Sequence, residues 1–173
     1  VAKFLSAWWD IYGRNSSPSF RNERFLIVEV ICDSFQETKI FASRLSKKIQ
    51  KGQVIALKGD LGSGKTTFSQ GIAEGLGIEQ HVGSPTFKLV SEYVGKVLKL
   101  YHVDCYRLNN FEEFLNLGGE NLLLPDNGIT LIEWANIIQE LLPEDVIEVV
   151  FSRVKGEPNK RLLKIVGMDN SNE

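Results

Sequence analysis

Residues 59–67 read GDLGSGKTT, and this stretch decides the fold. Its first eight residues fit the pattern G-x-x-x-x-G-K-[ST]. Glycines at three of these positions allow positive φ angles, so that successive backbone N–H groups can turn around a phosphate. The ammonium of Lys65 can reach the outer phosphates of a nucleotide, and the Thr66 hydroxyl can bind the Mg²⁺ that bridges them. The stretch therefore predicts a phosphate-binding loop.

The sequence on either side predicts a strand before this loop and a helix after it. Residues 54–57 (VIAL) form a short apolar run that is typical of a buried strand. Downstream, Phe68, Ile72 and Leu76 recur at helical spacing, and Gly77 is a suitable C-cap. A glycine-rich turn that binds nothing is the weaker alternative in this context. The chain is predicted to bind a nucleoside triphosphate together with Mg²⁺.

Composition indicates an ordinary globular chain. With 173 residues, of which 43% are hydrophobic, we expect one domain over residues 25–173 and a flexible extension over residues 1–24. No apolar run approaches the length of a membrane span. Cys32 and Cys105 lie far apart, which argues against a disulfide framework or a zinc site and fits a cytoplasmic location. Cys105 is more easily explained as a small buried thiol than as a nucleophile.

Charge is unevenly distributed along the chain. Residues 108–152 contain nine acidic residues and no Lys or Arg. An acidic face could dock a partner, although a solvated surface is the simpler interpretation. A row of cations on the predicted first helix could contact a nucleic acid, although a solvated helix face is again the simpler interpretation: Lys39, Arg44, Lys47, Lys48 and Lys51.

The remaining pattern alternates strands and helices. Ser34 and Glu37 form a capping-box pattern at the start of the first helix. We predict strands at residues 25–31, 54–57, 87–94, 97–106, 129–134, 146–154 and 161–166, and helices at 34–50, from the loop to 77, at 111–117 and at 135–142. This order predicts an α/β fold: a mixed β-sheet of the P-loop NTPase type, flanked by helices and including β-hairpins.

Two acidic residues end predicted strands and are candidates for the metal site. Hydrolysis of a bound nucleotide requires a carboxylate near the Mg²⁺ and a group that orients water. Asp104 lies in LYHVDCYR, where alternation places it on one face with His102 and Tyr106. Glu133 ends the apolar strand ITLIE. The alternatives are an ion pair between Asp104 and Arg107 and an ordinary surface charge at Glu133.

Two aromatic or basic neighbours of these acids have less specific roles. His102 is better explained as a hydrogen-bonded scaffold residue than as a base. Trp134 could flank the nucleotide or pack in the core.

The motifs that are present and absent narrow the class of nucleotide-binding protein. A guanine-specific switch should show D-x-x-G and N-K-x-D after the loop, and neither is found there. A small-molecule kinase is harder to exclude, but its lid arginines would fall in the segment that has no Lys or Arg. An ATPase that acts within a larger assembly remains.

Several segments together resemble the TsaE (YjeE) family, the ATPases of bacterial tRNA threonylcarbamoyladenosine (t6A) biosynthesis. These segments are GDLGSGKTTFSQGIAEGLG, GSPTFKLVSEY, LYHVDCYRL, LGGENLL and ITLIEW, within about residues 25–143. The loop alone occurs in many families, whereas its combination with SPTF and H-x-D-x-Y-R is far more specific. The family commonly reads LIEWP, and Ala135 replaces that proline here, which affects only the local turn.

The resemblance implies roles for particular residues. Thr86 would lie in a switch-like loop that senses the γ-phosphate, and Ser34 and Thr38 could approach the adenine. The nucleotide-binding residues would be Gly62, Ser63, Gly64, Lys65, Thr66, Thr67 and Thr86. Catalysis would fall to Lys65, Asp104 and Glu133, and Mg²⁺ ligation to Thr66, Asp104 and Glu133.

The resemblance also implies a biological role and partners. It implies a Mg²⁺-dependent ATPase, weakly active alone, that binds a complex of TsaD-like and TsaB-like proteins and resets it between tRNA cycles. Contact with tRNA would be indirect, and no membrane would be involved. The acidic stretch or the basic first helix would be the docking surface. A small-molecule P-loop kinase remains the alternative.

Overall fold

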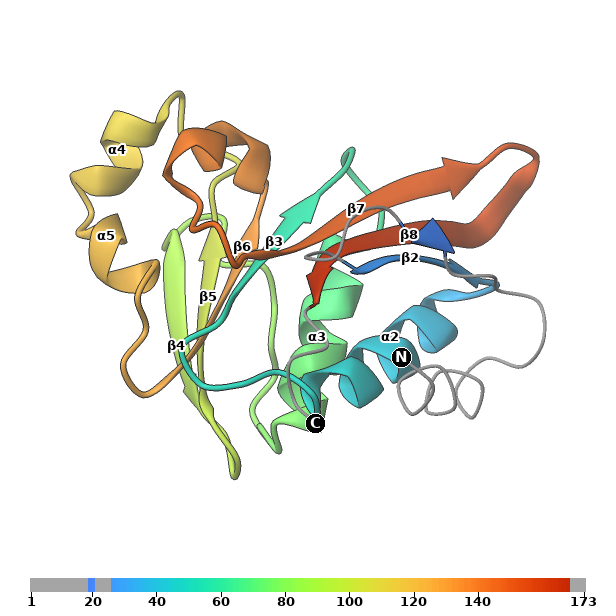
Figure 1. Ribbon diagram of the computed structural model, residues 1–173, viewed down its shortest axis with the longest axis horizontal. Coiled ribbons are helices and arrows are strands. Elements are labelled where there is room, and N and C mark those ends of the chain that lie inside the picture. Colours follow the sequence, from blue (N-terminus) through green and yellow to red (C-terminus); the bar gives the residue numbers. More distant parts are fainter. Residues whose placement is uncertain (1–18, 21–25, 169–173) are drawn as a thin grey trace.

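The computed structural model describes residues 19–20 and 26–168, which form one eight-stranded sheet with helices on both faces (Figure 1). The strands are β1 Ser19–Phe20, β2 Leu26–Cys32, β3 Val54–Lys58, β4 Val90–Val94, β5 Lys99–Asp104, β6 Gly128–Glu133, β7 Ile147–Val154 and β8 Glu157–Met168. The helices are α2 Phe35–Ser46, α3 Lys65–Gly75, α4 Phe111–Leu115, α5 Gly119–Leu122 and the 3₁₀ helix η2 Ala135–Leu141. The predicted α/β class with a mixed sheet is confirmed.

The sheet order explains why the site lies where it does. The order is β1-β2-β8-β7-β3-β6-β5-β4, in which β7, β3, β6 and β5 run parallel and the outer strands are antiparallel. Parallel strands end at one common edge of a sheet. Asp104 and Glu133 are register partners at that edge, and Glu133 also pairs with Leu57 just before the glycine loop.

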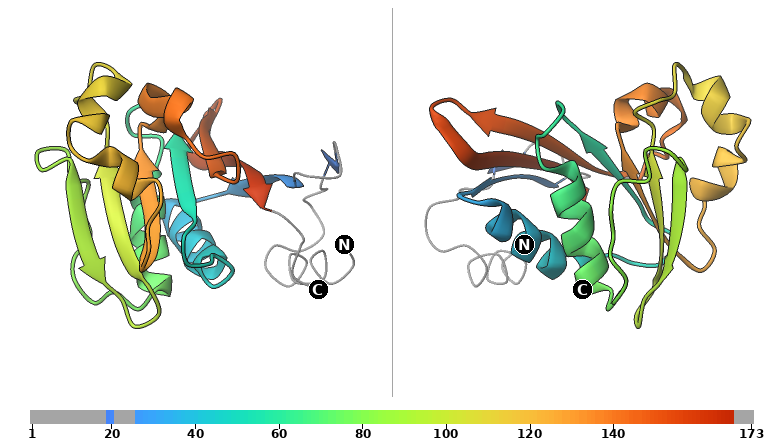
Figure 2. Two further views of the ribbon diagram at one scale, coloured as in Figure 1. Left: turned by 60° about the vertical axis from the view of Figure 1, so that its left-hand side comes forward. Right: turned by 180° about the vertical axis from the view of Figure 1, so that it is seen from behind.

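Alternating side chains of the central strands build an apolar core on each face of the sheet. In β3, Ile55 and Leu57 belong to the core beneath α2 and α3, whereas Val54 and Ala56 belong to the core beneath α4 and η2. Both faces are therefore covered, as expected of a sheet whose central strands are parallel. The edge of the sheet that carries the site therefore lies between two layers of packed helices (Figure 2).

Helices α2 and α3 lie side by side because α3 has glycines where they meet (Figure 2). A Cβ atom placed on Gly71 would lie 2.3 Å from the backbone oxygen of Lys39 and 2.7 Å from Cβ of Ala42. At Gly75 it would lie 1.9 Å from the Ser46 hydroxyl oxygen. Only glycine fits at these distances, so the helix that follows the phosphate loop is packed directly against α2.

We expect the Gly71→Ala variant to be less stable than the wild type by about 2 kcal/mol, because the added methyl group must push the α2 backbone away. Urea unfolding measures this loss as a lower midpoint at an unchanged slope. Gly83→Ala is the matched control, since the nearest atom to its Cβ position is 3.8 Å away. Equal midpoints for the two variants would contradict the packing argument.

The predicted end of α2 differs from the observed one, whereas the predicted cap of α3 agrees with it. Helix α2 ends at Ser46, and the last turn to Ile49 tightens through i→i−3 hydrogen bonds from Lys48 to Leu45 at 2.9 Å and from Ile49 to Ser46 at 3.3 Å. Ile49 is nevertheless buried. Helix α3 ends in a left-handed Gly77, whose N–H donates to the Glu74 oxygen, so the predicted glycine cap is confirmed.

Other segments depart further from the predicted elements. Residues 87–89 form a turn instead of the start of a strand, because the N–H groups of Lys88 and Leu89 both donate to the Pro85 oxygen. The predicted helix at 135–142 is a 3₁₀ helix with an irregular Ile138. Helix α5 was not predicted, and β8 starts at Glu157, so the last hairpin turns more tightly than expected.

The predicted extension over residues 1–24 lies mostly outside the described residues. Ser19–Phe20 pairs antiparallel with Ile27 and Leu26. None of the helices among the described residues has the length and apolar character that crossing a membrane requires.

Candidate nucleotide and magnesium site

The loop between β3 and α3 has the backbone shape that its glycines predict. Gly59, Gly62 and Gly64 have φ angles of 146°, 70° and 109°. A Cβ atom on Gly59 would also lie 2.8 Å from the backbone oxygen of Phe151, which excludes any other residue there. Helix α3 begins at Lys65, so its free N–H groups and positive end face the loop.

Lys65 lies across the loop as a nearly buried cation. Its Nζ donates to the backbone oxygens of Gly59 at 2.7 Å and Asp60 at 2.9 Å, and it lies 4.0 Å from the centroid of the Trp134 ring. Burial lowers the pKa of Lys65, an effect that three nearby carboxylates, Glu133 foremost, oppose. Phosphate oxygens would offer this ammonium stronger partners than neutral carbonyl groups.

Glu133 is buried at the end of β6 and accepts three hydrogen bonds. Its Oε2 accepts from the Thr66 hydroxyl at 2.9 Å, and its Oε1 accepts from the Ser69 hydroxyl at 3.0 Å. Nε2 of His102 lies 2.9 Å from Oε1. These contacts fix both carboxylate oxygens, so that His102 acts on the site by holding Glu133 in place.

Asp104 is held by the loop that carries the SPTF sequence. Its Oδ2 accepts from the hydroxyls of Ser84 and of Thr86, the latter at 2.8 Å, and its Oδ1 accepts from the N–H of Tyr106 at 2.9 Å. Among the described residues, Asp104 does not form the ion pair with Arg107 that the sequence left open. The Arg107 guanidinium lies over the Phe87 ring instead, 4.1 Å from its centroid.

The structure brings all the predicted site residues to one cavity of about 370 Å³. A smaller cavity of about 120 Å³ shares the lining residues Gly62, Gly64 and Thr67 with it. The larger one is lined by Leu61, Gly62, Ser63, Gly64, Lys65, Thr66, Thr67, Ser84, Thr86, Asp104, Tyr106, Glu133 and Trp134. The smaller one is lined by Phe35, Thr38, Gly62, Gly64, Thr67, Asn159 and Arg161.

The structure shows where the residues of two further sequence interpretations lie. Ser34 caps α2, with its hydroxyl accepting from the Glu37 N–H at 3.2 Å, and it does not line the smaller cavity, whereas Thr38 does. Trp134 both lines the larger cavity and packs against Tyr106, with ring centroids 5.0 Å apart. Burial raises the pKa of the Cys105 thiol to about 12, helped by the charge of Asp104, so this thiol is not a nucleophile near neutral pH.

Sequence reasoning missed four residues that contact the site. Ser69 lies one helical turn after Lys65, and Ser84 lies two residues before Thr86, so local spacing could have suggested both. Arg153 and Arg161 donate to backbone oxygens of the loop from the distant β7–β8 hairpin. No local pattern in the sequence could have revealed them.

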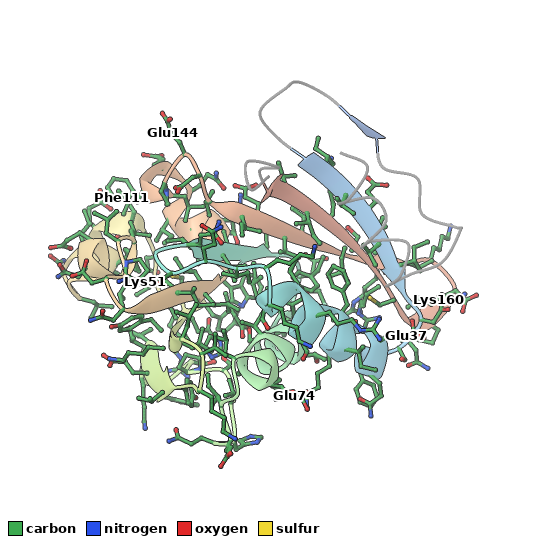
Figure 3. All side chains as sticks on the ribbon, turned by 60° about the horizontal axis from the view of Figure 1, so that its bottom comes forward. Glu37, Lys51, Glu74, Phe111, Glu144 and Lys160 are labelled. Carbon is green, nitrogen blue, oxygen red and sulfur yellow. The ribbon has the colours of Figure 1, made fainter. Side chains whose placement is uncertain are left out.

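Only part of the acidic stretch lies at one end of the molecule. Its helices α4, α5 and η2 lie near one another at the upper left of Figure 1, whereas its strands β6 and β7 run through the sheet. Figure 3 shows Phe111 and Glu144 at that end, and Glu37 and Lys160 at the other. Lys51 is labelled at the first of these ends as well, so acidic and basic side chains are present at both ends.

Residues 32–162 match the family described as "Threonylcarbamoyl adenosine biosynthesis protein TsaE". The chain belongs to the TsaE family. The match reaches into β8, beyond the motifs that suggested the family, which end near residue 143.

TsaE proteins of several bacteria are similar over most of their length. The tRNA threonylcarbamoyladenosine biosynthesis protein TsaE of Bacillus subtilis (strain 168) is 41% identical over 132 residues, covering 76% of this chain and 82% of the relative. The TsaE protein of Treponema pallidum (strain Nichols) is 36% identical, covering 75% and 93%. Among solved structures, Bacillus subtilis YdiB superposes with a TM-score of 0.68 at 33% identity, covering 86% of this chain and 90% of that one.

In this TsaE-family chain, Ala135 stands where the resemblance predicts proline. The chain leaves β6 through Trp134, whose φ of 58° is unusual for a residue other than glycine, and Ala135 is fully buried at the start of η2. The substitution leaves Glu133 in its buried position.

Proposed function

We propose that this chain is a Mg²⁺-dependent ATPase of the pathway that forms N6-threonylcarbamoyladenosine at position 37 of tRNA. The observation that carries the proposal is the single cavity in which the glycine loop, Lys65, Asp104 and Glu133 meet. Membership of the TsaE family supports the pathway. A cytoplasmic location is part of the proposal and is supported by the two buried cysteines, which are not joined by a disulfide.

The two neighbouring cavities, which share three lining residues, suggest how ATP would bind. The larger one offers loop N–H groups and Lys65 for the phosphates. The smaller one begins at the other side of Gly62 and Gly64 and is walled by Phe35, so it suits the adenosine. Thr67 lines both cavities, at the position where the phosphates would join the ribose.

The residues at the edge of the sheet fit a magnesium ion. Thr66, Asp104 and Glu133 offer oxygen atoms only, which Mg²⁺ prefers, and two carboxylates with substrate phosphates are its usual protein environment. Clusters of three or more His, Cys, Asp or Glu side chains suited to a metal are absent among the described residues, which argues against a cage made by the protein alone. When bound, Mg²⁺ would neutralise charge that develops on the phosphates during transfer to water.

The remaining chemistry falls to groups that the chain already positions. Lys65 would exchange the oxygens of Gly59 and Asp60 for those of the phosphates, and so would stabilise the negative charge of the transition state. Asp104 would orient the attacking water, as a carboxylate within reach of the loop. Asp104 also accepts a hydrogen bond from Thr86. Binding of the nucleotide beside Asp104 would therefore affect the SPTF loop and its exposed Phe87.

This coupling suggests how hydrolysis would serve an assembly. We expect TsaD-like and TsaB-like partners to stimulate a weak intrinsic activity, with any contact to tRNA made through them. A t6A synthesis reaction reconstituted without its TsaE component tests this role. Addition of this chain should restore repeated cycles of adenosine modification. Failure to restore them, with a phosphorylated small metabolite formed instead, would favour the kinase alternative.

A further inference from the structure

Two arginines of the β7–β8 hairpin bond to the outer side of the phosphate loop. Nη2 of Arg153 donates to the Leu61 oxygen at 2.8 Å, and Nε of Arg161 donates to the Ser63 oxygen at 3.0 Å. A third and longer contact of 3.4 Å joins Nη2 of Arg161 to the Gly62 oxygen. Three consecutive carbonyl groups of the loop thus face cations that come from more than 90 residues away.

Arg161 is itself held rigidly by its own strand. Its Nη1 donates to the backbone oxygens of Pro158 at 2.7 Å and Lys160 at 2.8 Å. With Nε and Nη2 on the loop, every nitrogen of the guanidinium group has a carbonyl partner. A guanidinium fixed in this way sets the position of the loop, and does not merely follow it.

Peptide geometry links these outer contacts to the inner face of the loop. The structure has no cis peptide bond among the described residues, and in a trans peptide the C=O and the following N–H point in opposite directions. Arg153 on the Leu61 oxygen therefore directs the Gly62 N–H to the other side of the loop. Arg161 on the Ser63 oxygen does the same for the Gly64 N–H, and Gly62 and Gly64 both line the larger cavity.

We propose that Arg153 and Arg161 are positioning residues that orient the loop N–H groups toward the phosphates and thereby set the affinity for phosphate-bearing ligands. This inference rests on the proposed nucleotide-binding function. The bonds are charge-assisted, which makes them stronger than bonds between neutral groups. The glycines allow the loop its shape, and the two arginines select that shape from the many that glycines permit.

The test measures binding of Mg²⁺-ATP and of Mg²⁺-pyrophosphate by calorimetry, with adenosine as the phosphate-free probe. We expect Arg153→Ala and Arg161→Ala each to raise the Kd for pyrophosphate about tenfold, the effect of losing one charge-assisted hydrogen bond. Arg153→Ala should leave adenosine binding unchanged, because Arg153 does not line the smaller cavity. For Arg153→Ala, the factor by which the KM for ATP rises should exceed the factor by which kcat falls.

Conservative and control variants separate positioning from a general effect on folding. Arg153→Lys should recover most of the affinity, since one donor suffices for the Leu61 oxygen, whereas Arg161→Lys should not, since a lysine cannot reach all four carbonyl partners. Lys155→Ala, at the tip of the same hairpin, should bind like the wild type. The nucleotide-free melting temperature of Arg153→Lys shows whether the hairpin is intact.

Two outcomes would overturn the inference: unchanged pyrophosphate affinity in both alanine variants, or an equal loss in Lys155→Ala. Binding is measured without hydrolysis, so the result is independent of whether the chain is an ATPase in its assembly. A wild-type chain that binds pyrophosphate but does not hydrolyse ATP would leave the two arginines in their role and refute the proposed function.

Discussion

Replacing Lys65 with alanine is expected to abolish ATP hydrolysis, with a fall in turnover of about a hundredfold or more. Lys65 is the one Lys or Arg among the residues that line the larger cavity, so no neighbouring cation can take its place at the phosphates. Lys65→Arg should be nearly as inactive, because a planar guanidinium does not fit where an ammonium lies between two carbonyl oxygens. Phosphate release under saturating ATP measures the loss.

The Lys65 variant should lose activity without losing its fold. Burial lowers the pKa of Lys65, so the charged form is disfavoured in the folded chain and its removal should leave the melting temperature close to that of the wild type. Lys96→Ala is the control, since Lys96 forms an exposed ion pair with Glu79 away from the site. If turnover falls only in proportion to the fraction of folded protein, unfolding explains the loss. That result would contradict a catalytic role for Lys65.

Glu133→Gln is expected to reduce turnover about a hundredfold while nucleotide affinity changes far less. The carboxylate accepts from Thr66, Ser69 and His102, and a glutamine must turn its NH₂ group toward at least one of these donors. We therefore also expect a loss of about 1–3 kcal/mol in the free energy of unfolding. If Glu133 supports the metal, activity that remains should require a higher Mg²⁺ concentration than in the wild type.

Control variants make this second prediction specific. Glu140→Gln changes an exposed acid of η2 and should affect neither turnover nor stability. Asp104→Asn should also reduce turnover more than binding, since its carboxylate faces the same cavity. If binding and turnover fall by equal factors in the Glu133 and Asp104 variants, both acids serve affinity and not the chemical step.

Features that depend on local spacing could be predicted from the sequence. The three left-handed glycines of the loop and the period-two pattern that ends at Asp104 and Glu133 are local, and the structure places them as expected. The turn at Pro85 was missed because a β-rich sequence continued through it, and Leu89 was forced to a φ of 63° by hydrogen bonding that composition does not show. The N–H of Asp104 also donates to the Leu89 oxygen at 2.9 Å, so that a tertiary contact overrides local propensity there.

Contacts between distant segments could not be predicted from the sequence. Arg153 meets Leu61 across 92 residues, and its hairpin looked like an ordinary pair of closing strands. His102 was expected to be a scaffold residue, but its partner could only be identified once β5 and β6 were paired. The parts of the site that bind by backbone geometry were therefore foreseeable, whereas the parts that position those groups were not.

We propose above all that this chain hydrolyses ATP with Mg²⁺ to support the t6A assembly. Phosphate release from ATP tests it most directly, measured for the full chain with and without TsaD-like and TsaB-like proteins and tRNA. We predict slow release by the chain alone, a clear stimulation by the complete set, and a loss of both in EDTA. An absence of phosphate release with every partner present, from a chain that binds ATP, would contradict the account.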